Sequence, residues 1–290
     1  MTARAAVVGW PIEHSLSPVL HGYWLREYDI DGSFERIPAE PGKFKEIALD
    51  LRANGFRGIN VTVPYKEEAL SLGQTIGQAA KVAGAANLLI FAKDGMIGAN
   101  NTDASGLFDS LEEKLGRVSL AGKNVVILGA GGAARGAAFG LQHFGYVAKI
   151  TILNRNKDRA DKLVADLSKH LPQANFVTET LENWPTAAAD AWLIVNTTSA
   201  GMKGNPPLSI DLSMLHKSTT VCDIVYNPLQ TPLLEQAAKH GLQTIDGLGM
   251  LMHQAVPSFR AFFFDEMGGK MPAVTPGLRG ALEKALKARE

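Results

Sequence analysis

The segment between residues 123 and 157 constrains the fold of this chain more than any other. It opens with the apolar run 125–128, which is rich in β-branched residues and predicts a buried strand. A glycine turn, an alanine-rich stretch that stops at Gly145 and a second apolar run over 149–153 follow in order. This succession predicts a βαβ unit, and therefore a parallel sheet with helices packed on it.

The turn after the first strand runs from Gly129 to Ala134 and matches the pattern G-x-G-x-x-A of dinucleotide-binding sites. Its first glycine permits a tight turn, its second lets the backbone approach a pyrophosphate, and Ala134 allows close packing of helix on strand. The phosphate belongs at the helix N-terminus, where N–H groups and the helix dipole attract an anion. A glycine turn without a ligand is the alternative, but the flanking strands and helix favour a dinucleotide site. The expected contacts are Gly129, Ala130, Gly131, Gly132 and Ala133.

The residues after the second strand distinguish the two nicotinamide dinucleotides. An NAD site usually has Asp or Glu there, which binds the ribose 2′-hydroxyl. This chain has Asn154-Arg155-Asn156-Lys157 instead, and Arg159 follows. Without a carboxylate to repel it, a 2′-phosphate can be gripped by Arg155 and attracted by Lys157. The pattern predicts NADP(H), although Lys157 and Arg159 also fit the solvated start of the next helix.

Composition narrows the class of protein. A chain of 290 residues with 46% hydrophobic residues is long enough for about two globular domains. Its 29 basic and 29 acidic residues balance, which argues against a nucleic acid as partner. Cys222 is the only cysteine and lies in an apolar run, so neither an intrachain disulfide nor a cysteine-based zinc site is expected.

No apolar stretch of the sequence is long enough to span a bilayer, and no apolar leader opens it. With a single cysteine, these features predict a cytoplasmic protein with no membrane partner. We expect a small-molecule substrate, no metal, and either a monomer or a homodimer.

Strands and helices alternate before the βαβ unit. The first helix is expected to have Ser17 as its N-cap and Pro18 at its first position. Strands are predicted near 4–9, 33–37, 58–63 and 87–91, and further helices near 41–54, 66–72 and 75–82. In the third strand Ile59, Val61 and Val63 alternate with polar residues and should share a face. Glycine and asparagine mark turns at Gly95, Gly98 and Asn100-Asn101.

A helix over 103–116 leads into the βαβ unit, and the alternation continues beyond it. Strands are predicted near 174–178, 191–198, 219–225 and 243–246, and helices near 157–169 and 231–240. The helices from 249 onward and near 276–289 have no strands of their own and should return to the first domain. We therefore predict a two-domain α/β protein. Residues 1–103 with 248–290 form an open α/β substrate-binding and catalytic domain, and residues 104–247 form a Rossmann NADP-binding domain.

Polar side chains gather where the strands of the first domain end. Four clusters stand out: 14–17, 60–66, Asn87 and 101–103. In an open α/β sheet this edge is where ligands bind. The hydroxyl and amide groups of the clusters suit a small polyhydroxylated molecule and are too neutral for a metal site. They belong to Ser15, Ser17, Asn60, Thr62 and Asn87.

Lys66 and Asp103 are the ionisable pair in these clusters that suits proton transfer. A hydride added to a carbonyl leaves an alkoxide, to which a lysine ammonium can give a proton, and a nearby carboxylate would hold that lysine in place. Taken singly, Lys66 also fits a solvated lysine in the first turn of a helix, and Asp103 fits a helix N-cap. His14 is a weaker acid–base candidate.

The order of these motifs resembles the shikimate dehydrogenase family, and the resemblance runs from end to end. It implies an NADP-dependent oxidoreductase that reversibly reduces 3-dehydroshikimate to shikimate, in aromatic amino-acid (chorismate) biosynthesis. Several of the motifs are more specific than a dinucleotide fingerprint. They are His14-Ser15-Leu16-Ser17-Pro18, Asn60-Val61-Thr62-Val63-Pro64-Tyr65-Lys66, Asn101-Thr102-Asp103, Gly129 to Arg135, Asn154-Arg155, Asn196 to Met202, Asp223 to Pro228, and Gly247 to Gln254.

The resemblance also implies a role for each matching residue. Lys66 and Asp103 become the catalytic pair, which outweighs the structural explanations given above. Ser15 and Ser17 would bind the substrate carboxylate. The ring of the substrate would be surrounded by Asn60, Thr62, Lys66, Asn87, Asp103, Tyr226 and Gln254. The cofactor would be contacted by Asn154, Arg155 and Lys157, and in later loops by Thr197, Ser199, Met202, Ile224, Tyr226 and Gly247.

Two positions depart from the family pattern, because Leu88 stands where threonine is usual and Ala104 where glycine is usual. Neither removes a catalytic group, but Leu88 can reshape the pocket. Relatives that accept quinate share the motifs, so a quinate/shikimate dehydrogenase of broader substrate use is the alternative, and Ser17 favours shikimate. Two more distant alternatives are a methylenetetrahydrofolate dehydrogenase, which should lack the serine and lysine motifs, and a non-catalytic NADP-binding module.

Overall fold

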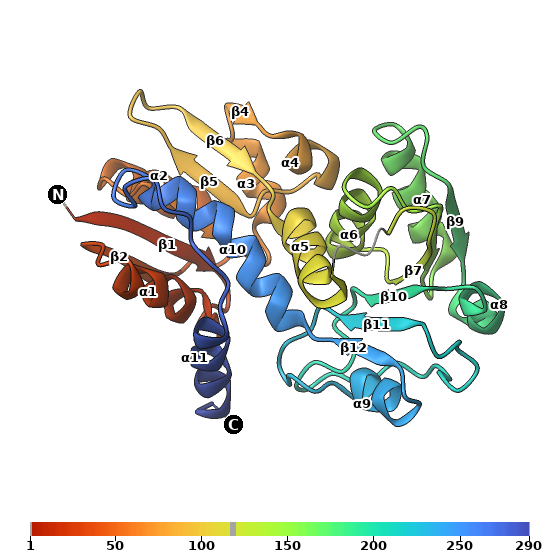
Figure 1. Cartoon of the computed structure of the whole chain (residues 1–290). Coiled ribbons are helices and arrows are strands. Elements are labelled where there is room, and N and C mark those ends of the chain that lie inside the picture. Colours follow the sequence, from red (N-terminus) through yellow and green to blue (C-terminus); the bar gives the residue numbers. More distant parts are fainter. Residues whose placement is uncertain (1, 117–119, 290) are drawn as a thin grey trace. The chain divides into compact units, whose positions relative to one another are not determined.

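The computed structural model describes residues 2–116 and 120–289. Its chain divides into two compact units, the first made of Met1–Thr102 and Met252–Glu290, and the second of Asp103–Leu251. Each unit holds one six-stranded sheet with helices packed on it (Figure 1). The mixed α/β class expected from the sequence is therefore confirmed. The domain boundaries expected from the sequence, after residue 103 and before residue 248, fall close to the limits of these units.

The sheet of the first unit has the strand order β2-β1-β3-β5-β6-β4. β1 pairs in parallel with β2 and with β3, whereas β5 runs antiparallel to β3 and β6. Because the chain goes from β1 to β2 on one side and returns to β3 on the other, the topological switch point lies between β1 and β3. The strands are β1 (Ala3–Gly9), β2 (Gly32–Pro38), β3 (Gly58–Val61), β4 (Thr75–Ile76), β5 (Leu88–Phe91) and β6 (Ile97–Asn100).

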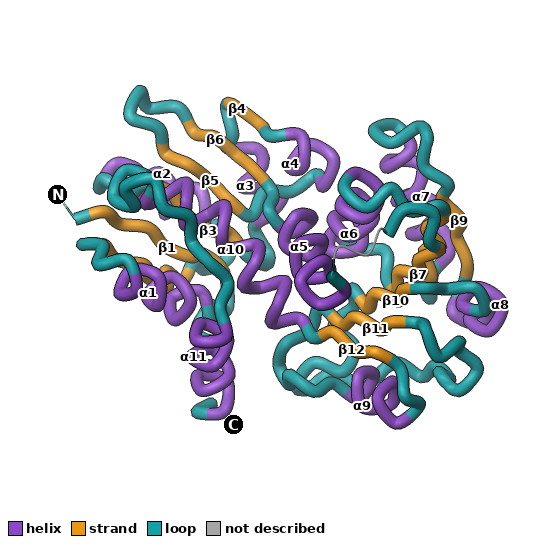
Figure 2. The backbone as a smooth tube through the Cα atoms, viewed as in Figure 1, coloured by secondary structure: helices purple, strands orange, loops and turns teal. Residues whose placement is uncertain are grey.

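Helices pack on both faces of this sheet (Figure 2). α2 (Phe44–Ala53), α3 (Lys66–Leu72) and α4 (Gln78–Ala83) contribute apolar side chains to one core, together with Ile59 and Val61. The other face meets α1 (Ser17–Glu27) and the aromatic side of α10 (Gly247–Phe263). A Cβ atom on Gly58 would lie 2.5 Å from the ring of Phe262, so glycine is needed where α10 crosses β3. The aromatic residues of α10 are core, as the sequence suggests, because Phe259, Phe262 and Phe263 have no exposed surface.

Three local predictions in this unit are wrong. Residues Ile97–Asn100 form β6, because pairing with β5 and β4 outweighs the weak strand preference of Gly98 and Asn100. Thr75–Ile76 form β4 beside β6, so the helix predicted from residue 75 begins only at Gln78. Val63 is 64% exposed because β3 ends at Val61, and the alternation predicted for this strand stops there.

The start of α1 also differs from the prediction. The helix begins at Ser17, and its N-cap position is Leu16, whose side chain makes no capping hydrogen bond. Pro18 lies in the first turn, as expected. The hydroxyl of Ser15 accepts a hydrogen bond from the N–H of Ser17 at 3.3 Å and so takes over part of the capping role. The hydroxyl of Ser17 is therefore not used to cap this helix.

His21 lies on the buried side of α1. It is 1% exposed, and its ring stacks on Phe34 with the ring centroids 3.8 Å apart. Within the described part of the chain, neither ring nitrogen has a hydrogen-bond partner. Burial lowers the pKa of His21 from 6.5 to about 3. Between these two values the unfolded chain binds a proton at this position and the folded chain does not.

We expect acid to destabilise the fold through His21. Below pH 6.5 the unfolded state is protonated first, so the free energy of unfolding should fall by about 1.4 kcal/mol per pH unit until about pH 3. The variant His21→Leu should lose this contribution and keep a similar stability near neutral pH. Urea unfolding at several pH values measures how the free energy of unfolding changes with pH. His143→Leu, which replaces an exposed histidine, is the control and should keep the pH dependence of the wild type. An unchanged slope in His21→Leu contradicts the prediction.

The sheet of the second unit has the strand order β12-β11-β10-β7-β8-β9, and all neighbours pair in parallel. This is the order of a Rossmann domain, with its switch point between β7 and β10. The strands are β7 (Asn124–Leu128), β8 (Lys149–Leu153), β9 (Phe176–Glu179), β10 (Leu193–Asn196), β11 (Thr220–Asp223) and β12 (Gln243–Ile245).

The helices of this unit are α5 (Asp103–Leu115), α6 (Gly132–His143), α7 (Lys157–Ser168), α8 (Trp184–Ala188) and α9 (Pro232–Lys239), with a short turn η1 (Leu181–Asn183). The sequence analysis missed η1 and α8. Trp184 anchors α8, because it is buried and its indole N–H donates to the Asp211 carbonyl at 2.7 Å. No helix in the described residues is long and apolar enough to cross a membrane.

Ala104, where the family usually has glycine, is accommodated in the packing of α5 on α6. It is 2% exposed. A Cβ atom on Gly140 would lie 2.6 Å from the Ala104 carbonyl oxygen. Glycine at position 140 therefore lets the two helices approach closely even though α5 carries an alanine there.

Candidate active site

The candidate site residues of the first unit lie at one edge of its sheet. β1, β3 and β6 end at this edge, and β5 begins there because it runs antiparallel to its neighbours. The edge includes the switch point between β1 and β3, where ligands bind in open α/β sheets. The predicted residues in or beside these strand ends are Ser15, Ser17, Asn60, Thr62, Lys66 and Asn87, and this part of the unit ends at Thr102, directly before Asp103.

The loops that follow β1 and β3 are tied together. The N–H of Thr62 donates to the Val8 carbonyl at 3.0 Å, and the N–H of Trp10 donates to the Val63 carbonyl at 3.1 Å. A Cβ atom on Gly9 would collide with the methyl group of Thr62. Only glycine at the end of β1 therefore lets Thr62 approach the loop that leads to Ser15 and Ser17.

A network of amide side chains, mostly buried, supports the same edge. The amide nitrogen Nδ2 of Asn60 donates to the Asn87 carbonyl at 3.1 Å and to Ser258 Oγ at 2.8 Å. The side chain of Asn87 bonds the N–H and the hydroxyl of Thr102, each at 2.9 Å. Gln254 joins through Oε1, which lies 3.3 Å from Thr102 Oγ1 and 3.4 Å from Asn87 Nδ2. No local pattern of residues predicts the contact of Ser258 or this role of Thr102.

Lys66 and Asp103 are both attached to this network through the main chain. Lys66 is the first residue of α3, and its carbonyl accepts from the Ala86 N–H at 2.7 Å. Asp103 is the first residue of α5 and directly follows Thr102, which Asn87 holds. Both side chains are half-buried. The dipeptide Ala86-Asn87 therefore fixes the main-chain positions from which both side chains extend.

Leu88, the other departure from the family pattern, is 2% exposed within β5. It pairs with Asn60 on one side and Asn100 on the other. The change from threonine thus puts an apolar side chain into the interior and adds no polar group at the edge.

The glycine turn of the second unit fits a dinucleotide. Gly129 has a φ of 108°, and a Cβ atom there would lie 2.9 Å from Thr197 Oγ1, so only glycine fits at the switch point. Thr197 in turn donates its hydroxyl to the Leu128 carbonyl at 2.7 Å. Cβ atoms on Gly131 and Gly132 would meet no other atom within 4 Å, and no side chain caps α6. The chain thus leaves open the space beside this helix end that a pyrophosphate requires.

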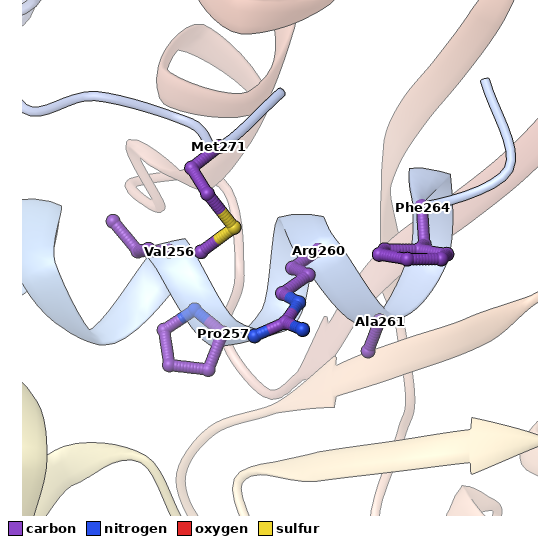
Figure 3. A pocket seen from close by; sticks show the side chains of 6 residues that line it. All are labelled: Val256, Pro257, Arg260, Ala261, Phe264 and Met271. Carbon is purple, nitrogen blue, oxygen red and sulfur yellow. The ribbon is translucent and has the colours of Figure 1, made fainter. Parts of the chain in front are cut away.

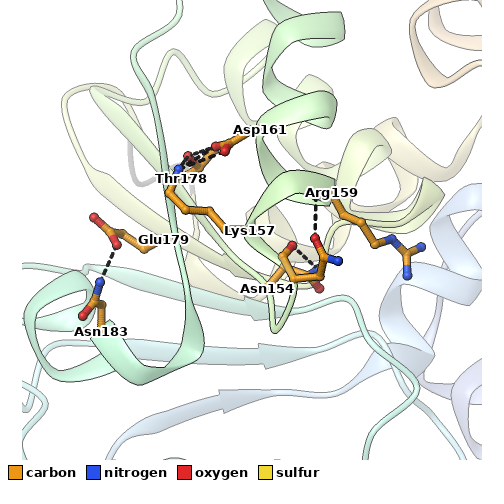
Figure 4. A network of polar contacts seen from close by, with 8 residues as sticks. Asn154, Lys157, Arg159, Asp161, Thr178, Glu179 and Asn183 are labelled. Carbon is orange, nitrogen blue, oxygen red and sulfur yellow. Dashed lines mark hydrogen bonds and ion pairs between the residues drawn. The ribbon is translucent and has the colours of Figure 1, made fainter.

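The end of β8 carries the residues expected to select the cofactor (Figure 4). Asn154 Nδ2 donates to the Asn156 carbonyl at 2.8 Å, and Asn156 caps α7 by accepting from the Arg159 N–H. Lys157 is paired with Asp161 at 2.8 Å and donates to Thr178 at 2.9 Å. Figure 4 shows the Arg159 side chain extending away from that pair. The Lys157 ammonium is thus bound by other side chains of the protein. The side chain of Arg159 extends away from them.

A buried carboxylate links the loops after β10 and β11. Asp223 has no exposed surface; it accepts from Asn196 Nδ2 at 2.9 Å, from the Val225 N–H at 3.1 Å and from the Thr231 hydroxyl at 2.7 Å. Asn196 Oδ1 accepts from the N–H and the hydroxyl of Thr198. Burial raises the pKa of Asp223, and the three donors oppose this. The sequence analysis missed this role. The available signal was that a polar residue, Asn196 or Asp223, ends each of two apolar runs.

These two loops hold the remaining predicted cofactor contacts. The N–H of Lys203 donates to the Asn227 carbonyl at 3.0 Å and joins one loop to the other. A Cβ atom on Gly247 would collide with the Ile224 carbonyl, so the start of α10 needs glycine to pack on the second loop. Ser199 and Met202 lie in the first loop, and Ile224 and Tyr226 lie in the second.

A separate cavity of about 520 Å³ lies along α10 (Figure 3). Its lining is apolar except for Arg260, and it includes none of the predicted site residues. Figure 3 shows Met271 above Val256, and Phe264 beside Ala261. Its chemistry does not suit a polyhydroxylated substrate. Among the described residues, no three His, Cys, Asp or Glu side chains are grouped to hold a metal ion.

Comparisons with known proteins agree with the motifs. Residues 7–89 match the substrate-binding domain of shikimate dehydrogenase, and residues 110–204 match the shikimate/quinate 5-dehydrogenase family. The chain is 45% identical over 280 residues to the NADP(+) shikimate dehydrogenase of Methylobacterium radiotolerans, which covers 96% of this chain and 95% of that one.

Two solved structures extend the likeness to the fold. Shikimate 5-dehydrogenase from Thermus thermophilus, in complex with NADP(H) and shikimate, has 30% identity and a TM-score of 0.81 over 99% of both chains. Quinate dehydrogenase from Corynebacterium glutamicum, in complex with NAD, has 29% identity and a TM-score of 0.86, also over 99% of both chains. With a relative this similar over nearly its full length, the chain belongs to the shikimate dehydrogenase family.

Proposed function

We propose that this chain catalyses the reversible NADPH-dependent reduction of 3-dehydroshikimate to shikimate. The observation that carries the proposal is the amide network at the sheet edge, which anchors Lys66 and Asp103 among neutral hydrogen-bonding groups. That combination suits proton transfer on a polyhydroxylated ring. The full-length relatives named above support the same activity and cofactor.

Lys66 and Asp103 share the proton chemistry in this proposal. NADPH, when bound, supplies the hydride that reduces the carbonyl carbon. The Lys66 ammonium gives a proton to the carbonyl oxygen as negative charge develops there, and solvent then returns a proton to the amine. The Asp103 carboxylate orients the ammonium. In the reverse direction the neutral Lys66 amine accepts the proton of the hydroxyl group that is oxidised.

Neutral side chains position the substrate. We assign the substrate carboxylate to the hydroxyls of Ser15 and Ser17. Asn60 gives both amide hydrogens to Asn87 and Ser258, which leaves its carbonyl oxygen to accept from a substrate hydroxyl. Further contacts with the ring are assigned to Thr62, Asn87, Gln254 and Tyr226.

The cofactor is assigned to the glycine turn and to the loops that Asp223 links. We propose that Asn154, Arg155 and Arg159 bind the 2′-phosphate. Lys157 is left out of this set because its ammonium is already paired with Asp161. Lys157 then adds positive charge nearby without direct contact.

Substitution of Arg155 should distinguish NADP from NAD. In Arg155→Gln we expect the KM for NADP⁺ to rise about thirtyfold and the KM for NAD⁺ to stay nearly constant, because only NADP⁺ has a 2′-phosphate. Lys157→Gln should change the KM for NADP⁺ less than threefold. Steady-state kinetics with each cofactor measures both effects. A larger effect from Lys157 than from Arg155 would reverse the assignment.

Oxidation rates with two acids and two cofactors test the function as a whole. NADPH formation should be fast with shikimate and NADP⁺ and slow with quinate or NAD⁺. The similarity to a quinate dehydrogenase keeps broader substrate use as the second candidate. Comparable kcat/KM values for quinate and shikimate would establish it, and no turnover with either acid would refute both. The expected cytoplasmic location and monomeric or homodimeric state stay predictions.

A further inference from the structure

Two arginines converge on the loop that carries Ser15. Arg36 lies in the second half of β2, and its Nε donates to the Ser15 carbonyl at 3.0 Å. Arg289 lies just beyond α11 (Pro276–Lys287), and its guanidinium donates to the His14 carbonyl at 2.7 Å and to the Ser15 carbonyl at 3.5 Å. Two positive groups from distant parts of the sequence therefore share one acceptor.

The fold of the first unit brings these arginines together. Arg36 points to the same face of β2 as Phe34, two residues earlier, and Phe34 stacks on His21 of α1. α11 packs against α1, and the Trp24 indole donates to the Ala273 carbonyl just before α11 begins. The far end of α11 thereby reaches the loop that precedes α1. The packing of α11 on α1 therefore brings Arg289 close to the loop that Arg36 also contacts.

Among the residues that the structure describes, no carboxylate forms an ion pair with either arginine. Four other arginines do form ion pairs: Arg4, Arg57, Arg135 and Arg279. Glu13 lies in the same loop, where its carboxylate accepts from the Ile12 N–H at 3.0 Å and no ion pair joins it to either arginine. Partial burial, and then the nearby charge of Arg289, lower the pKa of Arg36. Two like charges held close together favour an anion nearby.

We propose that Arg36 and Arg289 form a cationic pair that attracts the substrate carboxylate toward Ser15 and Ser17 without touching it. The inference rests on the proposed function, because it takes these serines as the carboxylate site. The 3.0 Å hydrogen bond and covalent geometry place the Arg36 guanidinium within about 8 Å of the Ser15 hydroxyl. This distance is about one Debye length at physiological ionic strength, so part of the attraction survives screening.

Kinetics with shikimate and with its uncharged methyl ester separate this role from a structural one. In Arg36→Gln and Arg289→Gln we expect the KM for shikimate to rise about threefold each, and about tenfold in the double variant. The kcat for shikimate and the KM for the ester should stay unchanged, and high salt should remove the difference between variant and wild type. Arg36→Lys keeps the charge and should retain most of the wild-type KM. Lys287→Gln, an exposed cation in the last turn of α11, is the matched control and should have no effect.

Two results would overturn the inference. An equal rise in KM for acid and ester would mean that the arginines only brace the loop. An unchanged KM for the acid in the double variant would exclude them from substrate recognition. If wild-type protein does not oxidise shikimate, the proposed function fails instead. Equilibrium binding of shikimate to wild type and to the double variant then decides the role of the pair, and equal affinities refute it.

Discussion

Replacement of Lys66 by methionine is expected to lower kcat for shikimate oxidation about a thousandfold, within the range that general acid–base groups contribute. Methionine has a similar length but carries no exchangeable proton. The KM values for shikimate and NADP⁺ should change much less, because other side chains are assigned to the carboxylate, the ring hydroxyls and the phosphate. Steady-state kinetics in both reaction directions measures the effect.

Three companion variants make the test specific. Lys81→Met removes an exposed lysine of α4 from the same unit and should leave kcat unchanged. Asp103→Asn should lower kcat about a hundredfold, because the ammonium loses its orienting carboxylate. The double variant should be hardly slower than Lys66→Met, since residues that act as a unit are not additive. A loss of only a few-fold in Lys66→Met would exclude Lys66 as the proton donor.

Local patterns explain why the second unit was largely predictable. The strand, glycine turn and helix from Asn124 to His143 are encoded by neighbouring residues. Gly129 shows the cause directly, because its φ of 108° and its contact with Thr197 exclude any side chain. The clusters that follow β1, β3 and β6 were predictable as well, since strands with the same direction bring their carboxyl ends to one edge. Asn87 reaches that edge for another reason, because β5 runs antiparallel to its neighbours.

Contacts between distant residues explain what the sequence did not reveal. β6 contains Gly98 and Asn100, which suggest a turn, and only its pairing with β4 and β5 makes it a strand. Ser258 is buried in α10 and reaches Asn60 across 198 positions of the chain. The hydrogen bond from Lys157 to Thr178 requires β9 to lie beside α7. No periodicity or motif encodes such contacts, because they depend on the packed fold.

Asp223 is such a case, and Asp223→Ala is expected to lower the free energy of unfolding by about 3 kcal/mol. The substitution leaves three buried donors, on Asn196, Val225 and Thr231, without their acceptor, and each unsatisfied group costs about 1–3 kcal/mol. Removing the carboxylate also removes the unfavourable free energy of burying its charge, which offsets part of this loss of stability. Urea unfolding measures the change. The control Asp211→Ala, which removes an exposed carboxylate bonded to Ser213, should cost less than 1 kcal/mol.

Because burial raises the pKa of Asp223, its ionised form is less favourable in the folded chain than in the unfolded chain. This cost diminishes as the pH falls through the folded-state pKa, since the folded chain then binds the proton first. Asp223→Asn is neutral at every pH, so it should lack this pH dependence and lose less stability than Asp223→Ala. An alanine variant as stable as wild type would show that the buried carboxylate does not hold these loops.

The same carboxylate should also affect cofactor binding, because it joins Asn196 at the end of β10 to Thr231 beyond β11. In Asp223→Asn we expect the KM for NADP⁺ to rise about tenfold, while the KM for shikimate changes little. The exchange variant Asn196→Asp/Asp223→Asn restores a donor and an acceptor between the two positions and should recover part of the affinity. If the variant yields less active protein but both KM values stay unchanged, Asp223 contributes only to stability. A rise in KM for NADP⁺ alone, partly reversed by the exchange, would show that the network positions the loops that bind the cofactor.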